Sequence, residues 1–104
     1  MTLSTLTDVL RAAQKKKVFV VGFVVQGWED AKAFVDAASE TNSNIVLQAG
    51  PAFRENMELG TIAKMFETLA KETNVKVVTH LDHGNDLEVC ERALDLGFTS
   101  VMFD

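Results

Sequence analysis

The stretch that decides the fold is residues 75–84, which read VKVVTHLDHG. Four of residues 75–81 are β-branched, and a short segment rich in such side chains predicts a strand. Ionisable residues follow directly, beginning with Asp82 and His83. A buried strand that ends in polar side chains suits an α/β protein, because ligands there bind beyond the carboxyl ends of parallel strands.

The same unit, an apolar run next to an amphipathic stretch, occurs on both sides of this strand. Further strands are predicted at residues 18–25, 45–49 and 99–103. Helices are predicted where apolar residues recur at helical spacing, over residues 3–17, 29–40, 59–71 and 86–96. The run 18–25 is almost uninterrupted, so we expect its strand to be buried on both faces.

Strands that alternate with helices indicate parallel βαβ units. Two architectures fit one opening helix followed by four strands and three intervening helices. One is an open doubly wound sheet, and the other is half of a (β/α)8 barrel. A full barrel needs about 250 residues, whereas this chain has 104.

Composition narrows the class of protein. Fifteen acidic residues against ten basic ones give a net charge of −5. This balance argues against a nucleic-acid partner, which would require a basic patch. The hydrophobic fraction of 47% is that of an ordinary globular domain. We recognise neither a signal peptide nor a run long enough to cross a bilayer, so we expect a soluble cytoplasmic protein with no membrane partner.

Residues where the predicted strands end are the candidates for function. These residues are Gln26, Gln48, Gly50, Asp82, His83 and Asp104. The run from His80 to Gly84 is the most informative, because it holds both histidines of the chain and a carboxylate. A neutral imidazole is the commonest metal ligand, and a carboxylate beside it can orient the ring or carry a proton. The alternative is one core histidine, one solvated histidine and an aspartate that forms a turn.

Residues 77–84, which read VVTHLDHG, resemble the signature of the class II, zinc-dependent fructose-bisphosphate aldolases and their tagatose-bisphosphate relatives. The resemblance covers essentially the whole chain. Residues 21–23 with Glu29 resemble the family's first strand and turn, and residues 45–48 resemble its second strand. Residues 94–104 resemble its fourth strand, and their Ser-Val-Met-x-Asp run forms a specific pair with His-x-Asp-His-Gly.

The resemblance implies the N-terminal half of a (β/α)8 TIM barrel, with four parallel strands preceded by one N-terminal helix. It implies a lyase that reversibly cleaves fructose 1,6-bisphosphate or tagatose 1,6-bisphosphate to dihydroxyacetone phosphate and glyceraldehyde 3-phosphate. The cofactor would be Zn2+, which polarises the ketose carbonyl so that no Schiff-base lysine is required. The implied partner is a phosphorylated ketose substrate, and we expect a homo-oligomer.

The same resemblance assigns roles to four residues. His83 would be one of three zinc-ligating histidines, and Asp82 would be the general acid–base at the C4 hydroxyl of the substrate. Asp104 corresponds to a carboxylate near the metal, and His80 would lie close by. The other two zinc histidines and the phosphate-binding loops belong to the second half of the barrel. We therefore expect residues 1–104 to be an incomplete domain that is inactive alone.

Three positions bear on substrate binding. Gln48 and Gly50 correspond to the substrate side of the second strand's end. Gly50 stands where the family commonly has Ser, and Val24 stands where it usually has Asn. Both departures remove hydrogen-bonding groups from the mouth of the barrel, so we expect weaker substrate binding.

Two other functions fit parts of the sequence. A non-catalytic half-barrel would bind or assemble through its exposed strand edges and apolar interior. Two such chains would close an eight-stranded ring, and a monomer on gel filtration would argue against this alternative. A metal-dependent hydrolase with a His-x-His-x-Asp-His motif would require a histidine where this chain has Val78.

Overall fold

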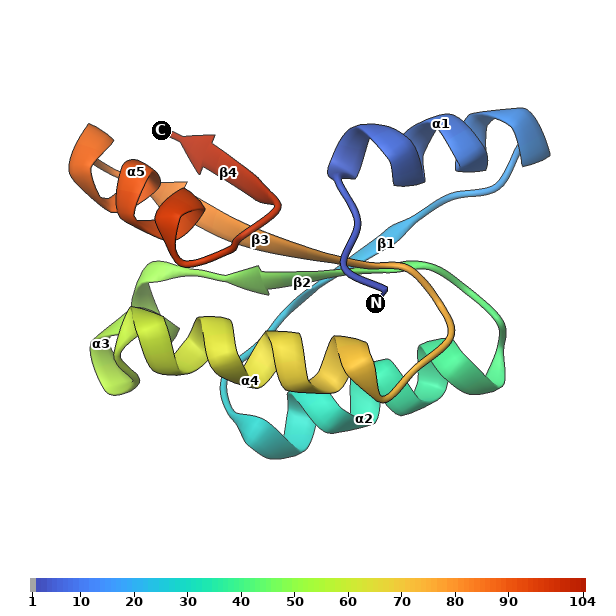
Figure 1. The fold of residues 1–104 in the computed structure, drawn as a ribbon, viewed down its shortest axis with the longest axis horizontal. Helices are drawn as coiled ribbons and strands as arrows, with labels where there is room; N and C mark the ends of the chain where they lie inside the picture. Colours follow the sequence, from blue (N-terminus) through green and yellow to red (C-terminus); the bar gives the residue numbers. More distant parts are fainter. Residues whose placement is uncertain (1) are drawn as a thin grey trace.

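The computed structural model describes residues 2–104, and its sheet has four parallel strands in the order β1-β2-β3-β4 (Figure 1). The strands are β1 (Val21–Val24), β2 (Ile45–Ala49), β3 (Val77–Gly84) and β4 (Ser100–Phe103). The helices are α1 (Leu6–Lys16), α2 (Trp28–Glu40), α3 (Pro51–Asn56), α4 (Leu59–Lys71) and α5 (Leu87–Asp95). Each strand pairs with the next one in the chain, as in a (β/α)8 barrel, whereas a doubly wound sheet reverses its strand order. The predicted α/β fold with four parallel strands is confirmed.

The sheet has helices on both faces. Helices α2 and α4 cover one face, and α1 lies over the other, which we call the inner face (Figure 1). Successive residues of a strand point to opposite faces. Ile45 and Leu47 therefore join the core beneath α2 and α4, while Val46 packs with Val9 of α1.

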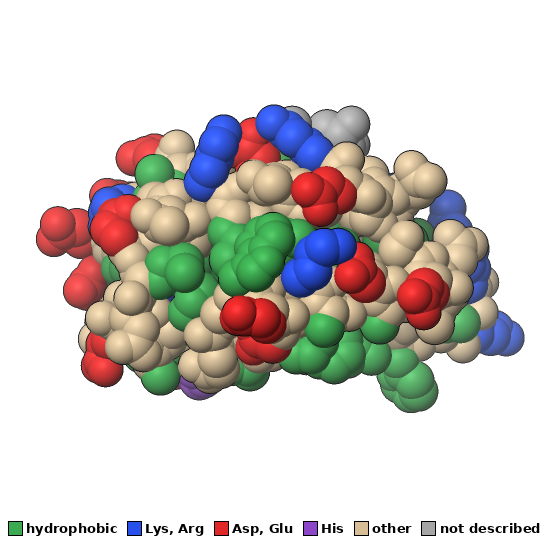
Figure 2. All heavy atoms as spheres, turned by 90° about the horizontal axis from the view of Figure 1, so that it is seen from below, with side chains coloured by type: hydrophobic (Ala, Val, Ile, Leu, Met, Phe, Trp, Pro, Cys, Tyr) green, Lys and Arg blue, Asp and Glu red, His purple; other side chains and the backbone are tan. Residues whose placement is uncertain are grey.

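The main core is built around three aromatic rings. The centroid of the Phe66 ring lies 6.5 Å from that of Phe53 and 6.1 Å from that of Phe98. All three side chains are buried, so α3, α4 and the segment before β4 share one apolar interior. On the outer face of α2 and α4, charged side chains are interspersed with apolar ones (Figure 2). None of the helices that residues 2–104 form is long and apolar enough to span a bilayer.

One expectation was wrong, and one helix was not expected. Strand β1 is shorter than residues 18–25 and is not buried on both faces, since Val21 is 52% and Val24 51% exposed. In the described part of the chain, β1 pairs only with β2, so the opposite edge of β1 has no neighbour. In addition, β2 ends at Ala49, and Gly50 and Pro51 begin α3, a short helix that was not expected. Proline suits this place because the first turn of a helix has no backbone bond for its missing N–H.

Candidate functional site

Three polar side chains form a row across the inner face. Gln48 of β2 is in register with His80 of β3, which is in register with Ser100 of β4. Residues in register on neighbouring strands project to the same face. The Nδ1 atom of His80 lies 2.7 Å from the Ser100 hydroxyl oxygen, so the two side chains share a hydrogen bond.

A hollow of about 210 Å3 lies between this row and α1. It is lined by Leu6, Leu10, Val20, Gly22, Val46, Gln48 and His80. Gly22 makes room for Gln48, because a Cβ atom at position 22 would lie 2.8 Å from the Gln48 Nε2 atom. The structure thus brings the predicted residues Gln48 and His80 into one hollow on the inner face.

Strand β3 carries a bulge beside this hollow. Leu81 pairs with Val101, but the next pair joins Gly84 to Phe103, so β3 has one extra residue between the two pairs. His83 lies within the bulge and has a left-handed backbone, with φ of 50°. Bulges of this kind re-aim side chains. Here the bulge lets two consecutive residues, Asp82 and His83, approach each other, although consecutive residues of a regular strand point to opposite faces.

The Asp82 carboxylate lies between the two imidazoles. Its Oδ1 atom is 3.4 Å from Nε2 of His80, and its Oδ2 atom is 3.5 Å from Nε2 of His83. These separations are long for hydrogen bonds, so the contacts are mainly electrostatic. The Asp82 side chain is 18% exposed. A carboxylate placed in this way is shielded from most of the solvent and remains open on one side.

His83 is tied to the last strand. Its Nδ1 atom lies 2.6 Å from Oδ2 of Asp104, whose backbone N–H donates to the Gly84 carbonyl. The hydrogen bond to Asp104, and then the charge of Asp82, raise the pKa of His83 above its ordinary value of 6.5. The His83 side chain is 54% exposed. The structure therefore brings Asp82, His83 and Asp104 together where β3 and β4 end.

Arg54, which no motif of the sequence marks, joins the ends of β2 and β3. Its Nη1 atom donates to the carbonyls of Ala49 (2.7 Å) and Asp82 (2.8 Å), and its Nη2 atom donates to that of His83 (3.1 Å). Burial lowers the pKa of Arg54 from its ordinary value. The only signal in the sequence is a basic residue one turn after the second strand.

Gly50 has a backbone role in the structure. It is the N-cap of α3, with an extended backbone at φ −89° and ψ 177°. A Cβ atom built there would meet no other atom within 4 Å among the residues described. Gly50 has no side chain that could show by its direction whether it faces a substrate. Its place on the substrate side therefore stays a prediction.

The chemistry of His83 and Asp104 fits one side of the zinc centre that the family resemblance implies. Imidazole and carboxylate are both donors that zinc accepts, and His83 and Asp104 lie next to each other. Within residues 2–104, however, no three His, Cys, Asp or Glu side chains gather closely enough to hold a metal ion. A zinc centre at this place would therefore need donors from outside these residues.

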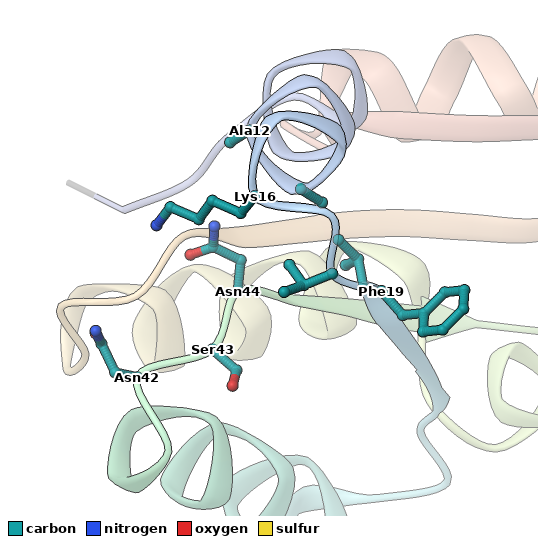
Figure 3. A pocket seen from close by; sticks show the side chains of 9 residues that line it. Ala12, Lys16, Phe19, Asn42, Ser43 and Asn44 are labelled. Atoms are coloured by element: carbon teal, nitrogen blue, oxygen red, sulfur yellow. The ribbon is translucent and has the colours of Figure 1, made fainter.

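A second hollow, of about 220 Å3, lies at the amino ends of β1 and β2 (Figure 3). Lys16, Phe19, Asn42 and Asn44 are among the residues that line it. The candidate site lies at the other end of the sheet, at the carboxyl ends of β3 and β4. In (β/α)8 barrels the active site lies at the carboxyl ends of the strands, so this hollow is separate from the candidate site.

Comparison with known proteins finds aldolases. Residues 4–104 match the family described as fructose-bisphosphate aldolase class-II. The chain is 34% identical over 105 residues to the fructose-bisphosphate aldolase of Giardia intestinalis, covering all of this chain and 32% of that one. It is 35% identical over 107 residues to that of Geobacillus stearothermophilus, covering all of this chain and 37% of that one. The chain thus spans about a third of the length of these relatives.

Comparison of the fold with solved structures also finds an aldolase. The crystal structure of the YdjI aldolase from Escherichia coli K12 superposes with a TM-score of 0.89 at 28% sequence identity. The match covers 96% of this chain and 39% of that one, so the four strands and their helices correspond to part of an aldolase barrel. The resemblance first drawn from residues 77–84 is confirmed over nearly the whole chain. The chain belongs to the class II fructose-bisphosphate aldolase family.

Proposed function

We propose that this chain supplies one side of the catalytic centre of a class II aldolase. The reaction is the reversible cleavage of fructose 1,6-bisphosphate, or tagatose 1,6-bisphosphate, to dihydroxyacetone phosphate and glyceraldehyde 3-phosphate. The observation that carries the proposal is the pairing of Asp82 with His83 at the bulge of β3. It offers a proton-transfer group beside a metal ligand, at the end of the strand where barrel enzymes bind substrate.

Asp82 is the residue that moves the proton. During cleavage its carboxylate would accept the proton of the C4 hydroxyl, and in the reverse direction it would return that proton. His80 keeps this carboxylate in place, because Ser100 holds Nδ1 of the ring while Nε2 lies 3.4 Å from Asp82. The neighbouring Gln48, on the same inner face, is available to hydrogen-bond the substrate.

His83 and Asp104 are the residues that would hold the metal side of the centre. Zinc, when bound, would polarise the carbonyl of the ketose. The contact between Nδ1 of His83 and Asp104 fixes the orientation of the ring. Because residues 2–104 provide no group of three candidate ligands, residues 1–104 alone should have negligible activity. We place the reaction of the whole enzyme in the cytoplasm and expect the enzyme to be a homo-oligomer.

A non-catalytic assembly module remains the second candidate, and the exposure of β1 favours it. Val21 and Val24 are half-exposed, and Phe19, just before the strand, is 99% exposed. An apolar strand edge of this kind invites pairing with another chain. Gel filtration of residues 1–104 tests this candidate, since a stable dimer supports assembly and a monomer argues against it.

The aldolase proposal is tested by a chimera in which residues 1–104 replace the matched segment of the Geobacillus stearothermophilus relative. We expect the chimera to cleave fructose or tagatose 1,6-bisphosphate in a coupled assay, to lose activity with EDTA and to recover it with zinc. Residues 1–104 alone should show no turnover above the uncatalysed rate.

The controls are the unmodified relative and a circular dichroism spectrum that shows the chimera to be folded. A folded chimera that binds zinc but cleaves neither ketose bisphosphate would contradict the proposal. So would EDTA-sensitive cleavage by residues 1–104 alone.

A further inference from the structure

The bulge of β3 places two backbone carbonyls beyond the regular ladder. The last residues of β2 and β3 that pair with each other are Ala49 and Leu81. The carbonyls of Asp82 and His83 lie past this point, where β2 has already turned into α3. Buried or partly buried carbonyls need donors, and at this place the backbone of β2 offers none in the pairing.

Arg54 supplies those donors. Its guanidinium donates to Asp82 and His83 and, on the neighbouring strand, to Ala49. The ion pairs formed among residues 2–104 do not include Arg54, so this partly buried cation is satisfied by carbonyls and not by a carboxylate. A guanidinium is a rigid planar fork with several donors, which suits it to hold several acceptors at fixed spacing.

The left-handed backbone of His83 needs such support. A non-glycine residue with positive φ is strained and persists where its surroundings over-determine it. His83 is held from two sides, because Arg54 binds its carbonyl while Asp104 binds its ring. Without the first contact the bulge could relax to regular strand, and Asp82 and His83 would then project to opposite faces.

We propose that Arg54 is a positioning residue that holds the bulge of β3, and thereby keeps the side chains of Asp82 and His83 together. The inference rests on the proposed function only for the roles of Asp82 and His83. The contacts that hold the bulge are made by this chain's own residues. The guanidinium of Arg54 binds the backbone carbonyls of Asp82 and His83 and not their side chains. It therefore acts on the two side chains through the backbone.

The test compares Arg54→Met, which keeps an unbranched stem but removes every donor, with Arg54→Lys, which donates from a single point. Arg92→Met and Arg92→Lys are matched controls, because Arg92 is an exposed arginine that pairs with Glu58 on the surface. Scalar and residual dipolar couplings measured by NMR on metal-free residues 1–104 report the φ of His83. Nuclear Overhauser effects report the contact between the His83 ring and Asp104.

We expect Arg54→Met to lower the ratio of left-handed to extended His83 about tenfold or more, given the strength of hydrogen bonds from charged donors. The contact between His83 and Asp104 should be lost with it. Arg54→Lys should give a smaller loss, and both Arg92 variants should match the unmodified chain. Urea titrations, together with the ring contacts of Phe66, show whether each variant is folded.

A folded Arg54→Met chain with unchanged His83 φ would overturn the proposal, because Arg54 would then only attach α3 to the sheet. If Arg54→Met does not fold, Arg54→Lys decides, and a His83 φ equal to that of Arg92→Lys would overturn it as well. These readouts need neither metal nor activity. Failure of the chimera to cleave substrate would therefore not affect the Arg54 proposal. An unchanged His83 φ in Arg54→Met would likewise not affect the aldolase proposal.

Discussion

Asp82→Asn in the chimera should lower kcat for cleavage by about 10²–10⁴-fold, the usual contribution of a general acid–base. Asparagine keeps the size of the side chain but cannot take up the proton of the C4 hydroxyl. Zinc content, measured by atomic absorption, should stay at the level of the unmodified chimera, because His83 and Asp104 are left intact.

Asp86→Asn is the matched control for this variant. Asp86 caps α5 by accepting from the backbone N–H of Val89 at 2.8 Å, and asparagine caps helices as well as aspartate. The control makes the same chemical change near the same strand, so kcat should not move. If Asp82→Asn instead loses zinc while turnover per bound zinc survives, the roles of Asp82 and His83 are reversed.

Phe66→Ala should destabilise residues 1–104 by about 3–5 kcal/mol. Phe66 is fully buried and packs against both Phe53 and Phe98, so its removal leaves a cavity at the centre of the main core. Domains of this size are stable by about 5–15 kcal/mol, so the change removes a large part of the total. Urea unfolding followed by circular dichroism measures the difference.

Phe19→Ala makes the same substitution at a side chain that is 99% exposed. Its effect should stay within about 0.5 kcal/mol, as for most surface changes. Equal losses in the two variants would show that Phe66 is not at the centre of the core. A large loss for Phe19→Ala alone would show that the exposed edge of β1 is covered in solution.

Much of the fold could be predicted because its signals are local. Residues 45–49 and 99–103 were expected as strands, and β2 and β4 lie there within one residue. The length and burial of β1 were overestimated. A hydrophobic segment tends to be buried, but burial also requires a neighbouring element that covers it. Nothing among the described residues covers the outer edge of β1. Helix α3 was missed because Gly50 and Pro51 stop a strand and start a helix with the same residues.

The candidate site was only partly visible in the sequence. His80, Asp82 and His83 stand out because ionisable residues crowd the end of one strand. The bulge leaves no such mark, since it depends on how β3 and β4 pair across a separation of about twenty residues in the chain. Arg54 was missed for the same reason, because its partners are backbone carbonyls, and every residue type has one.

We propose that His83 binds the metal while Asp82 beside it moves the proton. The most direct measurement is anomalous diffraction at the zinc edge from crystals of the zinc-loaded chimera. We predict one zinc peak bonded to a ring nitrogen of His83, with the Asp82 carboxylate outside the coordination shell. A zinc peak that does not contact His83, or one that Asp82 ligates, would contradict it.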